Sequence, residues 1–262
     1  MLTHTRRLAT LARSWRLLRA FQAEQTTPAD FYLPLAADTR ALLEGLVRDL
    51  IGGDGSMVGA RILDVGCGPG YFAAAFEDCT YVGVDSDLGE LASGASSPGS
   101  GKSRPHAICA DGHHLPFPDG SFDIVFSSNA AEHLPNWQAM ADDMVRVTRP
   151  GGLTVISYTV WLGPFGGHET GLWPHYLGGD YAARRYEKMH GHPPKNRFGT
   201  SLFAVSTAEG LRWLDTVHAT ARVALPRYHP WWAWWIVRVP VVREFLTSNL
   251  VVALVTPGKI QV

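Results

Sequence analysis

The sequence predicts an α/β protein built on a doubly wound, mostly parallel sheet of seven strands. Short apolar segments alternate with helical patterns through the middle of the chain. Two of those segments end in an acid, Asp64 and Asp85, and a glycine-rich turn at residues 66–70 follows the first. Alternation of strand and helix indicates parallel strands covered by helices on both faces.

Residues 1–25 are predicted to form one amphipathic helix. Leu8, Leu11, Trp15 and Leu18 recur at three- and four-residue spacing, and arginines occupy much of the remainder. Two interpretations stay open. The helix either packs on the edge of the domain with a solvated cationic face, or lies on an anionic membrane surface.

The next segment, residues 27–38, contains Pro28 and Pro34 and is expected to be irregular. A helix is predicted from Ala36 to Leu50, where glycines break the chain.

The remaining elements follow from runs of apolar residues and from helical periodicity. The turn should open a helix at Tyr71–Phe76, and residues 93–103 should be a flexible surface loop. The predicted strands span residues 61–65, 81–84, 106–109, 123–127, 153–158, 222–225 and 250–255, and the further helices 88–93, 137–147 and 207–216.

Two segments interrupt this pattern. Residues 162–198 are dense in glycine, proline, histidine and aromatics and show little periodicity, and residues 229–245 carry four tryptophans. The expected organisation is a helical cap at 1–55, a cofactor-binding core at 56–161, a substrate-side insertion at 162–200, and the rest of the core at 201–262 with the tryptophan-rich insertion at 229–245.

Bulk properties exclude several classes of protein. The 262 residues carry a net charge of −1, so the global basic field needed for non-specific nucleic-acid binding is missing. Three widely spaced cysteines indicate a reduced, cytoplasmic protein. The sequence contains no apolar run of about 18 residues, so no membrane-spanning helix is predicted.

The glycine-rich turn is the most informative motif. Its Gly-x-Gly-x-Gly spacing differs from the fingerprint of dinucleotide enzymes. Asp64, two residues before Gly66, suits a ligand with a cationic amine, such as the methionine end of S-adenosylmethionine, and would repel a pyrophosphate. Asp85 follows Gly66 by 19 residues, close to the spacing of about 20 for a ribose-binding acid, although a strand-end turn acid is the alternative.

Three later segments complete the pattern: residues 111–125 (with Leu-Pro-Phe-Pro-Asp-Gly-Ser-Phe-Asp-Ile-Val), 127–134 and 146–153. With the turn, they make residues 60–158 similar to the Methyltransf-11-type branch of class I S-adenosylmethionine-dependent methyltransferases. The segments outside this core resemble a mycobacterial and related actinobacterial group of predicted methyltransferases.

The resemblance implies a Rossmann-like sheet with an antiparallel last strand, S-adenosylmethionine as cofactor and S-adenosylhomocysteine as product. It also implies that Asp111 faces the adenine amino group. The residues expected to contact the cofactor are Asp64, Gly66, Cys67, Gly68, Gly70, Asp85, Ser86, Asp111, Gly112, His113, Ser128 and Asn129.

A hydroxyl acceptor needs a base, and the candidates are His133, His168 and Glu169, with Glu132 beside them. The alternative is that these residues only border the pocket or stabilise a loop. No metal is expected, because the His190–His192 pair lacks a carboxylate cluster. The residues expected to face the substrate are Phe31, Tyr32, Trp161 and Phe165.

The predicted activity is methyl transfer to oxygen of a small-molecule, sugar or lipid-linked acceptor. Residues 129–131 lack the motif of DNA amino-methylating enzymes. The helical cap, residues 162–198 and the tryptophan-rich segment are expected to form an apolar entrance. Alternatives are a non-catalytic scaffold in cell-envelope synthesis and an NAD(P)-binding oxidoreductase. Peripheral contact with the inner face of a membrane, and the oligomeric state, stay open.

Overall fold

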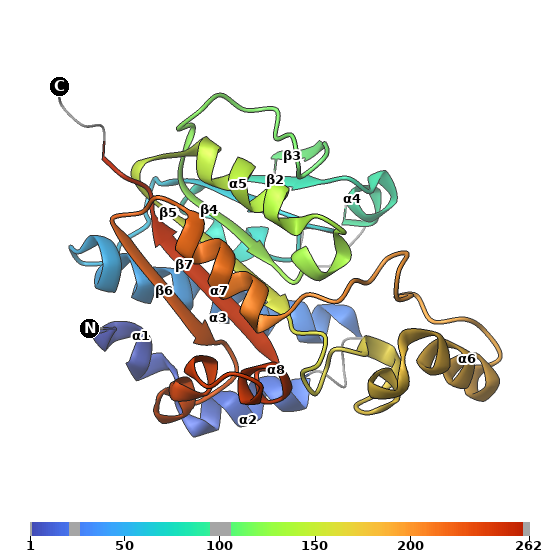
Figure 1. Cartoon of the computed structure of the whole chain (residues 1–262). Coiled ribbons are helices and arrows are strands. Elements are labelled where there is room, and N and C mark those ends of the chain that lie inside the picture. The colour runs from blue at the N-terminus through green and yellow to red at the C-terminus, as the bar shows by residue number, and fades with distance from the viewer. Residues whose placement is uncertain (1, 21–26, 95–105, 259–262) are drawn as a thin grey trace.

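A computed structural model describes residues 2–20, 27–94 and 106–258. Its centre is a seven-stranded sheet in the order β3-β2-β1-β4-β5-β7-β6 (Figure 1). β1 to β5 are mutually parallel, while β7 runs antiparallel to both of its neighbours. This confirms the predicted fold class. The strands are β1 (Arg61–Val65), β2 (Thr80–Asp85), β3 (His106–Cys109), β4 (Phe122–Ser128), β5 (Thr148–Thr159), β6 (Ala221–Pro226) and β7 (Asn249–Val255).

Helices cover both faces of the sheet. On one face α5 (Trp137–Val147) and α7 (Thr207–Thr216) bury Met140, Met144 and Trp213 against the sheet. On the other face lies α3 (Pro28–Leu46), whose Leu43 joins a second cluster. The other helices are α1 (Thr3–Leu8), α2 (Leu11–Ala20), α4 (Leu88–Gly94), α6 (Gly179–His190) and α8 (Val242–Leu246), with the π-helical turn η2 (Val47–Ile51) and 3₁₀ segments η3 (Ala73–Phe76), η4 (Ala131–His133), η5 (His168–Thr170), η6 (Pro174–Leu177) and η7 (Trp231–Arg238).

The helices α5 and α7 match their predicted bounds to the residue. Along α5, Trp137, Met140, Met144 and Val147 are buried, as their spacing indicates. The start of α7 is fixed by a capping box, in which Ser206 and Glu209 satisfy each other's backbone N–H groups.

The prediction of a single N-terminal helix is wrong, and the interpretation that packs this helix on the domain edge does not hold for Leu11 and Trp15. The helix is divided at Ala9–Thr10, and Leu11 and Trp15 are 65% and 56% exposed. Instead, Arg13 and Leu17 are buried. The cause is an ion pair, because Arg13 donates two hydrogen bonds of 2.6 and 2.7 Å to the carboxylate of Asp38 and rotates α2 accordingly. Residues 21–25 of the expected helix lie outside the described residues.

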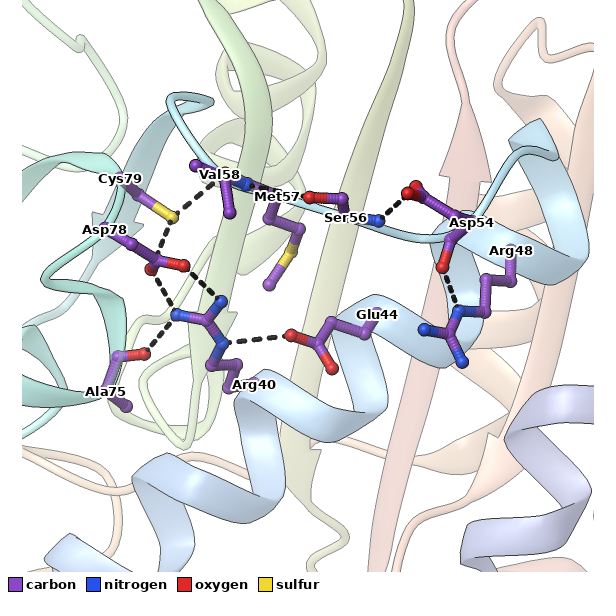
Figure 2. A network of polar contacts seen from close by, with 10 residues as sticks. All are labelled: Arg40, Glu44, Arg48, Asp54, Ser56, Met57, Val58, Ala75, Asp78 and Cys79. Carbon is purple, nitrogen blue, oxygen red and sulfur yellow. Dashed lines mark hydrogen bonds and ion pairs between the residues drawn. The ribbon is translucent and has the colours of Figure 1, made fainter.

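The irregular segment expected at residues 27–38 is helical. Pro28 stands at the beginning of α3, where no intrahelical N–H is needed, and the helix continues through Pro34. Figure 2 shows how α3 is fastened to the connection between β1 and β2. Arg40 binds Asp78 with both terminal nitrogens, the carbonyl of Ala75 at 2.7 Å and Glu44 at 3.0 Å.

One further expectation fails. The helix expected from Tyr71 is only the short η3, since β2 begins at Thr80 and leaves little chain between the turn and the next strand. Residues 162–198, whose sequence shows little periodicity, contain α6. Residues 95–103 of the expected surface loop lie outside the described residues. Among the described helices, none has the length and hydropathy required to cross a bilayer.

The buried ion pair gives a stability prediction. Asp38→Ala should lower the free energy of unfolding by about 3 kcal/mol, because the buried guanidinium of Arg13 loses its counter-charge. Asp78→Ala removes a pair whose carboxylate is 38% exposed and should cost about 1 kcal/mol or less. Urea denaturation of both variants measures the difference, and equal losses would contradict it.

Candidate functional site

The carboxyl ends of β1, β2 and β4 face a cavity of about 980 Å³. Its walls include the glycine-rich turn, the ends of β2 and β4, residues 165–196 of the insertion, and the helical cap through Leu18, Pro28 and Tyr32. Ligands of open α/β sheets bind at this end of the strands. The cavity is therefore the candidate active site.

The glycine-rich turn presents bare backbone to the cavity. Gly66, Gly68 and Gly70 all have positive φ values of 80°, 51° and 81°. A Cβ atom on Gly66 would lie 2.4 Å from the Cβ of Ala130, while one on Gly68 would meet no heavy atom within 4 Å. Gly68 thus leaves open space that a ligand can fill closely.

Asp85, at the end of β2, fixes the shape of this turn. One carboxylate oxygen accepts the N–H of Gly68 at 2.8 Å, and the other accepts the N–H of Asp87 at 2.9 Å. Each oxygen of a carboxylate can accept a second hydrogen bond. Asp85 can therefore also bind two neighbouring hydroxyls of a ligand.

Asp64 lies at the floor of the cavity and is buried. It accepts a 2.5 Å hydrogen bond from the hydroxyl of Tyr81. Burial raises the pKa of Asp64 from 3.8 to about 7, against the lowering effect of this hydrogen bond. A cationic group entering the cavity would favour the ionised form of Asp64.

A group of three side chains, Glu132, His133 and His168, lines the same cavity as Asp85. Nδ1 of His133 donates to the carbonyl of Ser201 at 2.6 Å, and the ring centroids of His133 and His168 are 5.3 Å apart. Burial lowers the pKa of His168, so that ring is neutral near pH 7. His168 has a φ of 47°, a strained value for a non-glycine residue and one that is common at functional sites.

The insertion is fastened over the cavity by polar contacts. Glu169 accepts hydrogen bonds from the backbone and side-chain nitrogens of Asn196, at 2.6 and 3.0 Å. Lys195 forms an ion pair with Glu90 of α4 at 2.9 Å. The cavity is consequently enclosed by the insertion on the side of α4.

At the end of β4, two residues are held by side chains from the end of β6 and the beginning of β7. Ser128 accepts a 2.9 Å hydrogen bond from Arg227, and Asn129 accepts one of 2.7 Å from Asn249. Asn129 also has a left-handed φ of 57°. Their positions relative to the glycine-rich turn are thereby fixed.

The structure brings together most of the residues singled out by the sequence. Those that line the cavity are Asp64, Gly66, Cys67, Gly68, Asp85, Ser86, Gly112, Ser128, Asn129, His133, His168, Glu169, Tyr32 and Phe165.

Five residues singled out by the sequence are absent from the described lining. Asp111 is exposed and accepts hydrogen bonds from His113. Phe31 is buried beneath Tyr32, and Trp161 packs on Phe198. The fifth is Gly70. The roles of these residues stay predictions.

Sequence reasoning missed several lining residues, among them Leu18, Glu90, Thr159, Leu172, Lys195 and Asn196. Nothing in their sequence neighbourhood marks them, because tertiary folding brings α4, the end of β5, the insertion and the cap to the cavity.

Comparisons with known proteins agree with this geometry. The family model "Methyltransferase domain" matches residues 63–156. Uncharacterized methyltransferases of Mycobacterium avium and Mycobacterium tuberculosis are 55% and 56% identical to the chain over 250 and 252 residues, and each match covers 95% of this chain and 96% of the relative.

A solved structure shares the fold. This protein of Methanococcus maripaludis bears the name of an S-adenosyl-L-methionine-dependent methyltransferase. It superimposes with a TM-score of 0.53 over 95% of both chains, at 12% sequence identity.

The buried carboxyl of Asp64 gives a pH prediction. Between pH 3.8 and about 7 the unfolded chain is ionised at this residue while the folded protein keeps the proton. The free energy of unfolding therefore falls by about 1.4 kcal/mol per pH unit through this range. Asp64→Asn keeps an oxygen for Tyr81 and carries no charge, so it should remove this decline.

Urea denaturation at about pH 5 and about pH 8 tests the prediction. The stability of the variant relative to the parent protein should increase at the higher pH. A difference that is the same at both pH values would show that Asp64 is already ionised in the folded protein.

Proposed function

The chain belongs to the S-adenosylmethionine-dependent methyltransferases, and from this premise we propose that it methylates a hydroxyl oxygen of an acceptor with a large apolar part, such as a lipid-linked sugar. The observation that carries the proposal is the continuity of the cavity. It joins the glycine-rich turn, the histidine pair and an apolar entrance in one space.

The residues at the glycine-rich end fit the methyl donor. S-adenosylmethionine, when bound, supplies an electrophilic methyl group on a sulfonium. Asp85 can accept hydrogen bonds from both ribose hydroxyls, Gly68 leaves room for close approach, and Asp64 offers a carboxylate to the ammonium group.

The group formed by Glu132, His133 and His168, which we call the acceptor end of the cavity, fits the acceptor. In the proposed reaction a bond forms between the acceptor oxygen and the methyl carbon, the carbon–sulfur bond breaks with its electrons passing to sulfur, and the hydroxyl proton passes to solvent water. We place activation of the hydroxyl at Glu132, His133 and His168. Glu169 is the weaker candidate, since Asn196 already occupies both of its carboxylate oxygens.

An apolar acceptor is supported by the entrance. Leu18 of α2, Pro28 of α3 and Leu172 of the insertion line the cavity. Leu172 is 60% exposed, so apolar surface extends outward from the cavity. Such a surface usually marks a ligand or partner site.

The outer surface beside the entrance has the composition of a membrane-binding face. Trp15 of α2 and Trp231, Trp232 and Trp235 of η7 are each half exposed or more. The two segments are adjacent, because the N–H of Trp231 donates to the carbonyl of Ala9 at 2.8 Å (Figure 1).

Charge supports the same assignment. Residues 2–20 and 230–242 contain six arginines and no acidic residue, and five of these arginines remain for the surface because Arg13 is buried against Asp38. Arg19 lies over the ring of Trp15, and Arg6 over that of Trp231. Exposed tryptophans beside arginines suit the interface of an anionic bilayer. We propose that this surface, formed by residues 2–20 and 230–242, docks on such a bilayer to receive the acceptor.

The donor site is tested with Asp85→Ala. Its affinity for S-adenosylmethionine, measured by calorimetry, should fall about 100-fold, because two charge-assisted hydrogen bonds are lost. Transfer of labelled methyl into the organic-soluble fraction of a cell extract should cease. Asp119→Ala, an exposed carboxylate in the same region of sequence, is the control. Label confined to the aqueous fraction would contradict the apolar acceptor.

The docking surface is tested with the double variant Trp15→Ala, Trp232→Ala. Its binding to phosphatidylglycerol vesicles, measured by sedimentation, should be about tenfold weaker than that of the parent, since two apolar anchors are removed. Trp173→Ala, on the insertion and 50% exposed, should bind like the parent. Absence of parent binding, or an equal loss in the control, would overturn the membrane assignment.

A further inference from the structure

Three side chains with the chemistry of metal ligands converge at the acceptor end of the cavity. One carboxylate oxygen of Glu132 and one ring nitrogen each of His133 and His168 lie within 4.8 Å of one another. They come from two short helices, η4 and η5, that are more than thirty residues apart in the sequence.

The carboxylate of Glu132 is buried and incompletely paired. The side chain belongs to a residue that is 1% exposed, and Oε1 accepts the N–H of Thr159 at 3.0 Å. Within the described part of the chain, Oε2 has no hydrogen-bond partner and Glu132 takes part in no salt bridge. A buried charge left in this state is costly unless a cation neutralises it.

Both imidazoles are oriented by backbone carbonyls. Nδ1 of His133 lies 2.6 Å from the oxygen of Ser201, and Nδ1 of His168 lies 3.3 Å from that of Gly166. A carbonyl only accepts, so each Nδ1 carries the proton and the lone pair is on Nε2. A ligating histidine commonly has this arrangement, with its second nitrogen donating to an oxygen.

We propose that Glu132, His133 and His168 bind one divalent cation of the first transition row. Two imidazoles and one carboxylate suit Zn²⁺, Fe²⁺ or Co²⁺, whereas Ca²⁺ and Mg²⁺ favour oxygen ligands alone. Bond lengths of about 2.1 Å require the three ligand atoms to approach one another by about 1 Å. Side-chain rotation on the two short helices can supply that movement.

The proposed cation would activate the acceptor hydroxyl, and this role rests on the proposed function. Three protein ligands leave a coordination position open, and the acceptor hydroxyl would take that position. A cation there lowers the pKa of the hydroxyl, whose proton passes to solvent water before the methyl group is transferred. The histidines then act as ligands and remove no proton themselves.

The histidine pair noted in the sequence is a natural control. His190 ends α6 and His192 lies two residues further on; both are exposed, and His190 stacks on Tyr186 while His192 meets it edge-on. Neither belongs to a ligand cluster with a carboxylate among the described residues.

The test is a titration with Co²⁺. The full chain is first freed of metal with a chelator and is then titrated. The visible absorption of Co²⁺ should saturate at one ion per chain. Glu132→Gln keeps an oxygen for the N–H of Thr159, and His168→Asn tolerates the left-handed backbone. Each should weaken Co²⁺ binding by about tenfold or more, and His190→Asn should leave it unchanged.

Three results would overturn the inference. They are saturation below one ion per chain, binding that both cluster variants retain, and binding that His190→Asn removes. Methyl transfer at an unchanged rate in the chelated protein would refute the catalytic role of the cation. It would not contradict the proposed methyltransferase activity. Stoichiometric Co²⁺ binding without binding of S-adenosylmethionine would support the cation site and refute the proposed donor site.

Discussion

The arrangement of the whole active site depends on one buried guanidinium. Arg227 is 1% exposed and donates to Ser128 and Ser157 at 2.9 and 2.8 Å, and to Thr39 at 2.6 Å. A charge taken out of water costs several kcal/mol unless hydrogen bonds surround it. The ends of β4 and β5 and the middle of α3 must therefore meet at this point. Arg13 adds α2 through the carbonyl of Arg227.

This constraint fixes the helical cap to the active site. The cap that contributes Leu18, Pro28 and Tyr32 to the cavity is held against the sheet by the same network that holds Ser128. Asn129, next to Ser128, takes a left-handed conformation that is unfavourable by itself. Fixing the residue before it helps the fold to maintain that conformation.

The sequence predicted what local chemistry decides and missed what distant contacts decide. The period of α5 and the capping box of α7 depend on neighbouring residues, and both helices were predicted correctly. The buried face of α2 was predicted wrongly, because Arg13 looks like any other arginine until Asp38 is placed beside it. Pro34 suggested a break in α3 that the packing of this helix overrides.

The same distinction applies to the site. The glycine-rich turn and Asp85 act through backbone geometry within one strand–turn–strand unit, so their spacing alone identified them. The side chains of the insertion have no such signature. Lys195 reaches Glu90, and Glu132 meets His168, only because residues 162–198 fold back over the sheet.

The two ends of the cavity differ in the charge that they favour. The donor end offers the carboxylates of Asp64 and Asp85 and bare backbone, which suits a ligand carrying an ammonium and a sulfonium. The acceptor end combines a neutral His168 with a buried, half-satisfied carboxylate of Glu132. A cation at Glu132 would balance that carboxylate and would leave an acceptor alkoxide close to neutral surroundings. The negative oxygen could then approach the donor's positive methyl group within the cavity, where their attraction is stronger than in bulk solvent.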